Sequence, residues 1–299
     1  MRETSYTLGR MRLRLMLRPA LLLASLLVTT AALAQPVGFD QALEAREVGM
    51  GGAYRALGTT AVGVDGNPAA LALFKLFQLD AGGAYDFGTQ TWYLAAFVRD
   101  SQSSPLAAGY SFQYLSQPLD TSSGQTYVTG FQQVFAFAVP VADYMTVGVS
   151  SHWITESALH INAASLDVGT AFKIGTVVTL GFAGHNLIDT GHPVQLGRYF
   201  DLSTGLKFGP VRLAIDTLAN FGPHQFHPKL LFGTEVGIGK SFFIRAGFDW
   251  YTRTEQLAPA LYLTAGVGFN VDKGGFDLGY QQSLNHVGNL LVATLRMVL

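Results

Sequence analysis

Eleven charged side chains in the second half of the sequence are the residues most able to take part in binding or catalysis. Each falls on one face of a segment in which residue types alternate, and acids and bases are mixed among them. The set is Asp167, Lys173, Asp201, Lys207, Arg212, Asp216, Glu235, Arg245, Asp249, Asp277 and Arg296. Such a mixture predicts a salt-bridged, hydrogen-bonded interior surface. The alternative is that part of the set lines a polar path for a solute.

Metal binding and catalysis have weaker support. The seven histidines fall at the ends of these segments or in the connections between them, at His152, His160, His185, His192, His224, His227 and His286. His224 and His227 could supply two metal ligands, but the sequence has no cysteine and no clustered carboxylates beside them. No spacing selects a nucleophile and base of the Ser-His-Asp kind. We therefore expect no enzymatic activity, no cofactor and no metal site.

Fourteen alternating segments must position these charged residues. Each is close to the ~9–11 residues that a tilted strand needs to cross a bilayer. The expected spans are 77–87, 90–99, 105–115, 126–139, 144–154, 162–173, 176–186, 199–208, 210–220, 229–238, 241–252, 259–270, 274–283 and 289–299. The fold class that this count predicts is all-β.

The alternation also predicts which way the side chains face. In segment 241–252, Phe242, Ile244 and Phe248 fall on one face, whereas Arg245 and Asp249 fall on the other. A period of two residues puts each set on one face of a sheet. In a transmembrane barrel the apolar set faces lipid and the polar, glycine-bearing set faces the lumen. A soluble β-sandwich would bury the apolar set, but it has no reason to keep fourteen strands near membrane-spanning length.

Composition and connection lengths favour the barrel. Hydrophobic residues make up 49 % and charged residues only 13 %, yet no uncharged apolar run after residue 35 reaches the ~20 residues of a membrane helix. Bacterial barrels alternate short periplasmic turns with longer external loops. Tight connections at 140–144, 173–176, 208–211, 239–241 and 271–275 alternate here with longer ones at 116–126, 155–162, 186–199, 220–228, 252–259 and 283–288. Only the first two connections are of comparable length.

Residues 1–34 have the form of a cleaved signal peptide. Five arginines precede the apolar stretch 21–33, and Ala32-Leu33-Ala34 fits a cleavage site. Export predicts the outer membrane of a Gram-negative bacterium, with outer-membrane lipid around the barrel, and a last strand ending in Leu299 fits assembly there. Without the leader, 14 basic and 19 acidic residues remain, which argues against a nucleic-acid partner.

Residues 35–75 do not alternate, so they form a separate segment before the barrel of residues 76–299. They contain two motifs, Gly49, Gly51, Gly52 and Ala53, then Asn67, Pro68 and Ala69. With these motifs the sequence resembles the FadL-like outer-membrane barrels, which include long-chain fatty acid transporters and PorV/PorQ-type proteins. The resemblance implies fourteen strands and an N-terminal segment that plugs the lumen. Glycine suits such a segment because it permits close backbone approach and positive φ.

Later motifs extend the resemblance over most of the sequence. Residues 180–187, 232–235, 243–248, 264–269 and 276–280 resemble elements of the PorV-like branch. Two features depart from the family pattern: Thr59-Thr60 stands where an acidic pair is usual, and Gly66 stands where an aromatic residue is common. The exported part is also short beside the fatty acid transporters, with little room for external helices that capture lipid.

Two functions are consistent with this resemblance. The first is transport of hydrophobic or small solutes across the outer membrane, with a hydrophobic ligand as partner. The second is a PorV-like, non-transporting barrel that acts as a scaffold or shuttle for a secretion, surface-attachment or gliding-motility machine, with a periplasmic or surface protein complex as partner. We rank transport first because it is the commoner role in the superfamily.

Overall fold

A computed structural model describes residues 43–58, 61–121, 124–157, 160–188, 190, 196–219, 221–222, 225–226, 228–251, 260–285 and 288–299. The expected signal peptide (1–34) and the first residues of the expected plug segment (35–42) lie outside the described residues. The expectations for them therefore stay predictions.

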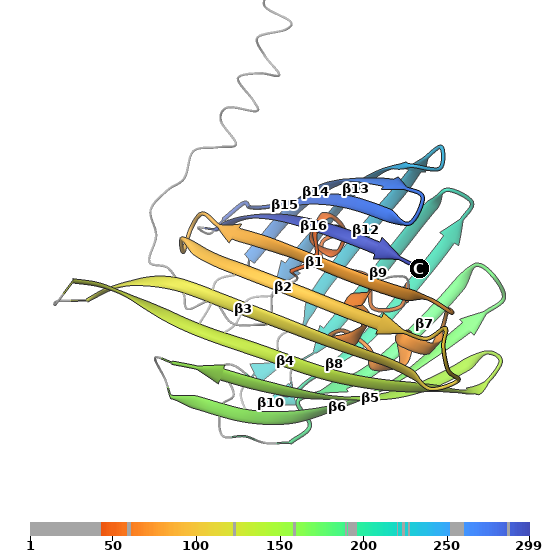
Figure 1. Cartoon of the computed structure of the whole chain (residues 1–299), viewed down its shortest axis with the longest axis horizontal. Coiled ribbons are helices and arrows are strands. Elements are labelled where there is room, and N and C mark those ends of the chain that lie inside the picture. The colour runs from red at the N-terminus through yellow and green to blue at the C-terminus, as the bar shows by residue number, and fades with distance from the viewer. Residues whose placement is uncertain are drawn as a thin grey trace, which may run out of the picture.

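Fourteen strands of the described residues form a closed antiparallel barrel, as the alternation predicts (Figure 1). The first and last strands close it, with Asp80 opposite Arg296. The strands are β1 (Phe77–Asp86), β2 (Thr91–Asp100), β3 (Ala107–Thr121), β4 (Gly124–Ala142), β5 (Met145–Glu156), β6 (Ile161–Ile174), β7 (Val178–His185), β8 (Tyr199–Phe208), β9 (Val211–Ala219), β12 (Lys229–Ile238), β13 (Phe242–Tyr251), β14 (Ala260–Val271), β15 (Gly274–Ser283) and β16 (Asn289–Val298). A separate two-stranded ribbon joins β10 (Phe221–Gly222) to β11 (Gln225–Phe226).

The connection expected at 116–126 is wrong, because β3 and β4 continue through most of it. Their ladder runs on to the pair Thr121 and Gly124, and Figure 1 shows this hairpin projecting beyond the other strands. Pro118 and the polar residues around it are typical of a loop. Beyond Ser116, however, β3 has no partner on the β2 side, and proline is tolerated on such an edge.

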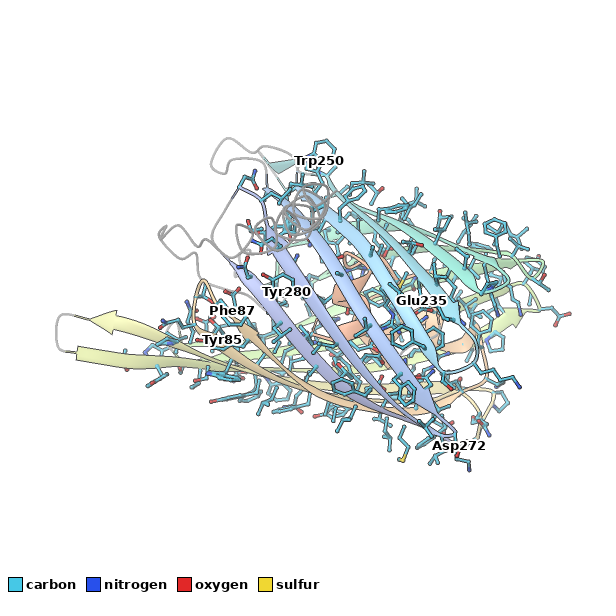
Figure 2. The ribbon with its side chains drawn as sticks, turned by 90° about the horizontal axis from the view of Figure 1, so that it is seen from above. Tyr85, Phe87, Glu235, Trp250, Asp272 and Tyr280 are labelled. Carbon is cyan, nitrogen blue, oxygen red and sulfur yellow. The ribbon has the colours of Figure 1, made fainter. Side chains whose placement is uncertain are left out.

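The two ends of the barrel differ in the connections that they carry. The short-turn end has the connections 101–106, 143–144, 175–177, 209–210, 239–241 and 272–273. Gly209 and Gly239 lie there with φ of 57° and 67°, a backbone conformation that glycine adopts at little cost. The long-loop end has mostly longer connections. The exceptions are the two-residue joint of the β3–β4 hairpin and the connections 87–90 and 157–160, which are shorter than 101–106 at the other end. Figure 2 places Asp272 and Trp250 at these opposite ends, with Glu235 between them.

The outer surface of the barrel is apolar, as the alternation predicts. Leu295 is 65 % exposed and Phe269 is 50 % exposed, whereas their neighbours Thr294 and Gly268 are buried. Exposed aliphatic and aromatic side chains recur on alternate residues of the other strands, which is the pattern of a barrel embedded in lipid. Among the described residues, no helix is long and apolar enough to span a membrane.

Three short helices of the described residues lie inside the barrel. They are the α-helix α2 (Ala45–Gly49) and the 3-10 helices η1 (Ala61–Val64) and η2 (Pro68–Ala72). α2 contacts β13 to β16, and η2 contacts β3 to β7. The chain between them crosses the lumen, which places these helices on opposite sides of the interior (Figure 1).

Candidate functional site

The inner segment, residues 43–58 and 61–76, fills much of the lumen, and its two motifs shape it. Gly51 and Gly52 have φ of 65° and 76°, so the backbone can reverse directly after α2. Asn67 caps η2, since its side-chain oxygen accepts a hydrogen bond from Ala69 N at 3.0 Å. Pro68 occupies the first position of η2, where its missing N–H costs nothing.

A belt of glycines on the inner wall lets this segment lie directly against the strands. In most of these positions an added Cβ would meet the inner segment closer than ordinary van der Waals contact; at Gly266, for example, it would lie 3.0 Å from Gly49 Cα. The glycine belt comprises Gly109, Gly148, Gly169, Gly181, Gly205, Gly233, Gly247, Gly266 and Gly279. It therefore explains why glycine shares the inward face with polar residues.

Wall side chains fix the inner segment by hydrogen bonds. Arg99 on β2 donates to three carbonyl oxygens of the segment: Gly58 at 2.6 Å, Leu71 at 2.7 Å and Phe74 at 2.9 Å. On the opposite wall, Asp216 accepts from the backbone N–H groups of Tyr54 and Arg55 at 3.0 and 3.1 Å. Since backbone groups buried away from water need such partners, the wall holds the segment at several separate points.

The buried carboxylate of Glu235 is the centre of the charge network. Arg46 of the inner segment donates to both of its oxygens at 2.7 and 2.9 Å, Arg245 donates at 2.7 Å, and Arg212 also pairs with it. Arg245 further reaches Asp277 at 2.6 Å, and Arg296 lies 2.9 Å from the same carboxylate. Five of the sequence-predicted lumen charges, Arg212, Glu235, Arg245, Asp277 and Arg296, thus meet in one network with Arg46.

The other predicted charges are distributed along the wall. Asp249 pairs with Lys229 at 3.1 Å, and Asp216 holds the inner segment as described above. Asp201 is buried beside a histidine, whereas Lys207 is exposed at the short-turn end. Arg46 and Arg55 were absent from the predicted set, because residues 35–75 show no strand alternation from which their facing could be read.

His152 and His185 lie near the ends of β5 and β7, as expected, but both are buried. His185 bridges two carboxylates, with Nδ1 3.0 Å from Asp167 and Nε2 2.7 Å from Asp201. His152 Nε2 lies 2.6 Å from Asp167. Both histidines fall on the inward phase of their strands, a signal already present in the sequence. His160 is an exposed turn residue, and His192, His224, His227 and His286 lie outside the described side chains. Among the described residues, no group suited to a metal ion is found.

One side of the inner wall is apolar. Tyr93, Phe97, Leu115, Ile154 and Leu290 are buried there, in a cluster with residues of the inner segment. These side chains come from β2, β3, β5 and one end of β16, whereas the Glu235 network lies on β9, β12, β13, β15 and the other end of β16. The lumen therefore presents an apolar wall and a charged wall, with the inner segment between them.

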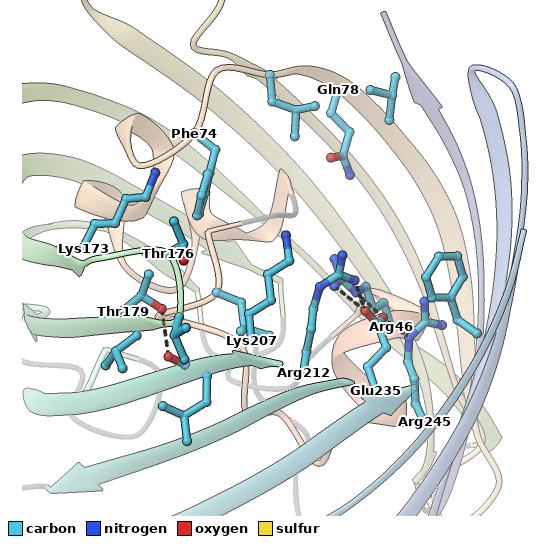
Figure 3. Close-up of a pocket in the computed structure, with 18 of the residues that line it drawn as sticks. Arg46, Phe74, Gln78, Lys173, Thr176, Thr179, Lys207, Arg212, Glu235 and Arg245 are labelled. Carbon is cyan, nitrogen blue, oxygen red and sulfur yellow. Dashed lines mark hydrogen bonds and ion pairs between the residues drawn. The ribbon is translucent and has the colours of Figure 1, made fainter. Parts of the chain in front are cut away.

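A cavity of about 500 Å³ opens at the short-turn end, beside the inner segment (Figure 3). Figure 3 shows Lys207, Lys173, Arg212 and Arg46 around it, with the paired Arg46 and Glu235 at one side. Uncharged polar residues also line it, namely Gln78, Thr176, Thr179 and Asn270. Aliphatic and aromatic residues supply much of the remaining lining: Leu57, Phe74, Leu76, Val177, Val178, Leu206, Phe243 and Val298. A space of this size and character can hold a small molecule.

The folded inner segment should become less stable as the pH rises. Burial, reinforced by the nearby Asp80 carboxylate, raises the pKa of Glu44 from 4.5 to about 8. Between these values the folded state holds a proton that the unfolded state has released, so stability falls as the pH rises from about 4.5 to 8. We expect amide hydrogen exchange in residues 43–58, corrected for its intrinsic rate, to be faster at pH 8.5 than at pH 5.5.

The substitution Glu44→Gln should remove most of this pH dependence, because the amide has no proton to lose. The pKa shift of Glu44 corresponds to a change of at most ~5 kcal/mol in the free energy of unfolding over this pH range. An equal pH effect in the wild type and in Glu44→Gln would assign it to other groups, such as Glu47, whose pKa burial also raises.

The comparisons with known proteins agree with this architecture. No family model matches the sequence, and no curated protein matches it. The fold is similar to that of the CymD monoaromatic hydrocarbon channel (TM-score 0.67, 11 % identity, 88 % of this chain and 98 % of that one). It is also similar to that of a Pseudomonas aeruginosa FadL homologue (TM-score 0.65, 14 % identity, 88 % of this chain and 99 % of that one). A third similar structure is the Ralstonia pickettii toluene transporter TbuX (TM-score 0.61, 12 % identity, 87 % of this chain and 98 % of that one). The expected fold, a fourteen-stranded barrel like those of FadL-type proteins, is confirmed.

Proposed function

We propose that this barrel lies in the outer membrane and transports hydrophobic or small solutes across it. The observation that carries the proposal is the divided lumen: a cluster of apolar side chains on the barrel wall lies beside the inner segment, and the ion pairs of the segment with the wall lie on the opposite side. Its structural neighbours include a monoaromatic hydrocarbon channel and a toluene transporter, which supports the same class of solute here.

A hydrophobic solute would follow the apolar wall. Tyr93, Phe97, Leu115 and Ile154 offer it contacts without a charged group to desolvate, and burying apolar surface is favourable at about 25 cal/mol per Å². Passage requires the inner segment to leave this wall, which breaks its hydrogen bonds with Arg99 on β2, while Arg46 keeps it attached to Glu235 on the other side. Residues 35–75 thus act as a plug that opens towards the apolar side.

The remaining expectations fit the same proposal. A leader at residues 1–34 would deliver the chain to the periplasm for insertion of residues 76–299 as the barrel. The named structural neighbours are channels and transporters, which is consistent with a protein that has no enzymatic activity. Nothing in these neighbours favours the PorV-like scaffold over a transporter.

Uptake by whole cells tests the proposal. Plain phospholipid vesicles let hydrophobic solutes cross unaided, so the barrel should be expressed in a Gram-negative host that lacks its own FadL-type transporters. We expect the protein to raise the initial uptake of radiolabelled toluene or long-chain fatty acid severalfold over cells with an empty vector. No increase, together with a stoichiometric protein partner in a pull-down from the outer membrane, would replace transport by the scaffold function.

A matched pair of variants locates the path. Leu115 is buried on the apolar wall, whereas Leu94 on the adjacent strand is 58 % exposed on the outer surface. We expect Leu115→Trp to reduce uptake and Leu94→Trp to leave it unchanged at equal amounts of folded barrel. Equal uptake by both variants would place the path elsewhere in the lumen.

A further inference from the structure

The cavity at the short-turn end collects far more positive charge than the chain as a whole. Seven of the 14 lysines and arginines that follow residue 34 line it, against a single carboxylate, Glu235. They are Arg46, Lys75, Lys173, Lys207, Arg212, Arg245 and Arg296. The same part of the chain has 19 acidic residues, so this imbalance reflects placement and not composition.

The neighbouring carboxylates do not neutralise this charge. Arg46, Arg212 and Arg245 share Glu235, while Arg245 and Arg296 share Asp277. Asp80 lies opposite Arg296 on the neighbouring strand, so four guanidinium groups face three carboxylates, and guanidinium stays charged in proteins. Glu44 adds little negative charge below pH 8, because burial raises its pKa to about 8.

Three lysines add to the surplus. Within the described residues, none of Lys75, Lys173 and Lys207 pairs with a carboxylate within 4.0 Å. Lys75 donates to the carbonyl oxygen of Ser104 at 3.0 Å, and Lys173 lies 5.0 Å from the centre of the Phe74 ring. Lys207 is exposed and lies between Lys173 and Arg212 in Figure 3. Since like charges repel one another, a bound anion would stabilise this arrangement.

We propose that this cavity is a binding site for an oxyanion, a carboxylate or phosphate group held by Lys173, Lys207 and Arg212. Ammonium and guanidinium groups only donate hydrogen bonds, and their bonds to ionised oxygens are the short, strong kind. Val177, Leu206 and Phe243 line the same space, so a small hydrocarbon body attached to the oxyanion also fits. The site faces the short-turn end, where a solute would leave or enter the lumen.

Equilibrium binding to the full-length, detergent-solubilised barrel tests this site directly. The probes are inorganic phosphate, benzoate and benzyl alcohol, the last matching benzoate in size without its charge. We expect both anions to bind, and benzoate to bind at least about tenfold more tightly than benzyl alcohol. Raising the salt from 0.05 to 0.5 M should weaken anion binding, because salt screens charges at an open site. If phosphate and benzoate bind equally well, the site recognises only the oxyanion. If benzoate binds and phosphate does not, the site is specific for an organic carboxylate. Either outcome supports the site.

The double variant Lys173→Gln/Lys207→Gln should weaken anion binding about tenfold or more. The control is Lys240→Gln/Lys273→Gln, which removes two exposed lysines from turns at the same end that do not line the cavity. Equal losses in both double variants, or equal binding of benzoate and benzyl alcohol, would overturn the proposal. Because these measurements follow binding and not uptake, their failure is distinguishable from failure of the transport proposal.

Discussion

Glu235→Gln should destabilise the folded protein by ~3–5 kcal/mol, the cost of removing one partner from a buried ion pair. Glu235 is 1 % exposed and accepts hydrogen bonds from Arg46, Arg212 and Arg245. A glutamine amide keeps the shape but removes the charge and turns an N–H₂ group towards the guanidiniums. We expect the inner segment to detach first, because the ion pair of Arg46 with Glu235 is, with that of Arg55 and Asp216, one of the ion pairs that join it to the wall.

Two measurements separate loss of the inner segment from loss of the barrel. Hydrogen exchange in residues 43–58 reports the segment, and the heat-dependent shift of the folded band in gel electrophoresis reports the barrel. The control Asp272→Asn removes an exposed carboxylate from a turn at the short-turn end, so it should change neither. Unchanged exchange in Glu235→Gln would contradict the anchoring role.

A second substitution keeps this prediction testable if Glu235→Gln folds poorly. The double variant Arg46→Met/Glu235→Gln also removes one of the guanidinium groups that Glu235→Gln leaves without its carboxylate partner. The double variant should then be less destabilised than the two single variants added together, and a coupling of 0.5–3 kcal/mol is typical of residues in one network. Simple additivity would show that the pair does not act together.

The barrel could be predicted because its signal is local. Lipid on one face and a polar lumen on the other impose a period of two on every strand, and Phe242 to Trp250 shows it within one segment. The extension of the β3–β4 hairpin was missed because this alternation is absent from it. Beyond Ser116 the hairpin has no third strand beside it, so the environment that imposes alternation ends while the pairing of the two strands continues.

The partners in the charge network could not be predicted, because they depend on register. Glu235 lies directly opposite Arg212 on one side and Arg245 on the other, and a shift by one residue would separate them. Arg46 reaches the same carboxylate from 189 positions away. His185 is different: Gly181, Ala183 and His185 share one phase, so its inward facing could have been read from the sequence.

The two predicted motifs and the inward glycines are parts of one device. Between Gly49 and Ala53 the inner segment has few side chains large enough to reach a distant wall. The backbone itself must therefore lie against the wall. It can do so only where the wall strands lack Cβ atoms, and the glycine belt supplies such positions on nine strands. The same closeness allows short hydrogen bonds such as Thr146 Oγ1 to Ala69 O at 2.8 Å.

Gly233→Ala/Gly279→Ala should therefore loosen the inner segment with a single methyl group at each position. The three atoms nearest to an added Cβ at Gly233 all belong to Met50, with Met50 Cβ at 2.7 Å, and those nearest to one at Gly279 all belong to the Ala45 backbone. Overpacking of this kind costs ~1–3 kcal/mol per site. We expect faster hydrogen exchange in residues 43–58 and a higher conductance in planar bilayers.

The sign of the effect distinguishes this device from a general response to substitution. Gly237 and Gly274 lie on the same two strands, β12 and β15, but an added Cβ there would find its nearest atoms at 3.4 and 3.7 Å. Within a strand, alanine is normally more stable than glycine by ~0.5–1 kcal/mol. Gly237→Ala/Gly274→Ala should thus leave exchange and conductance unchanged, or stabilise the barrel slightly. Similar behaviour of the two double variants would mean that close backbone contact with the wall does not hold the inner segment in place.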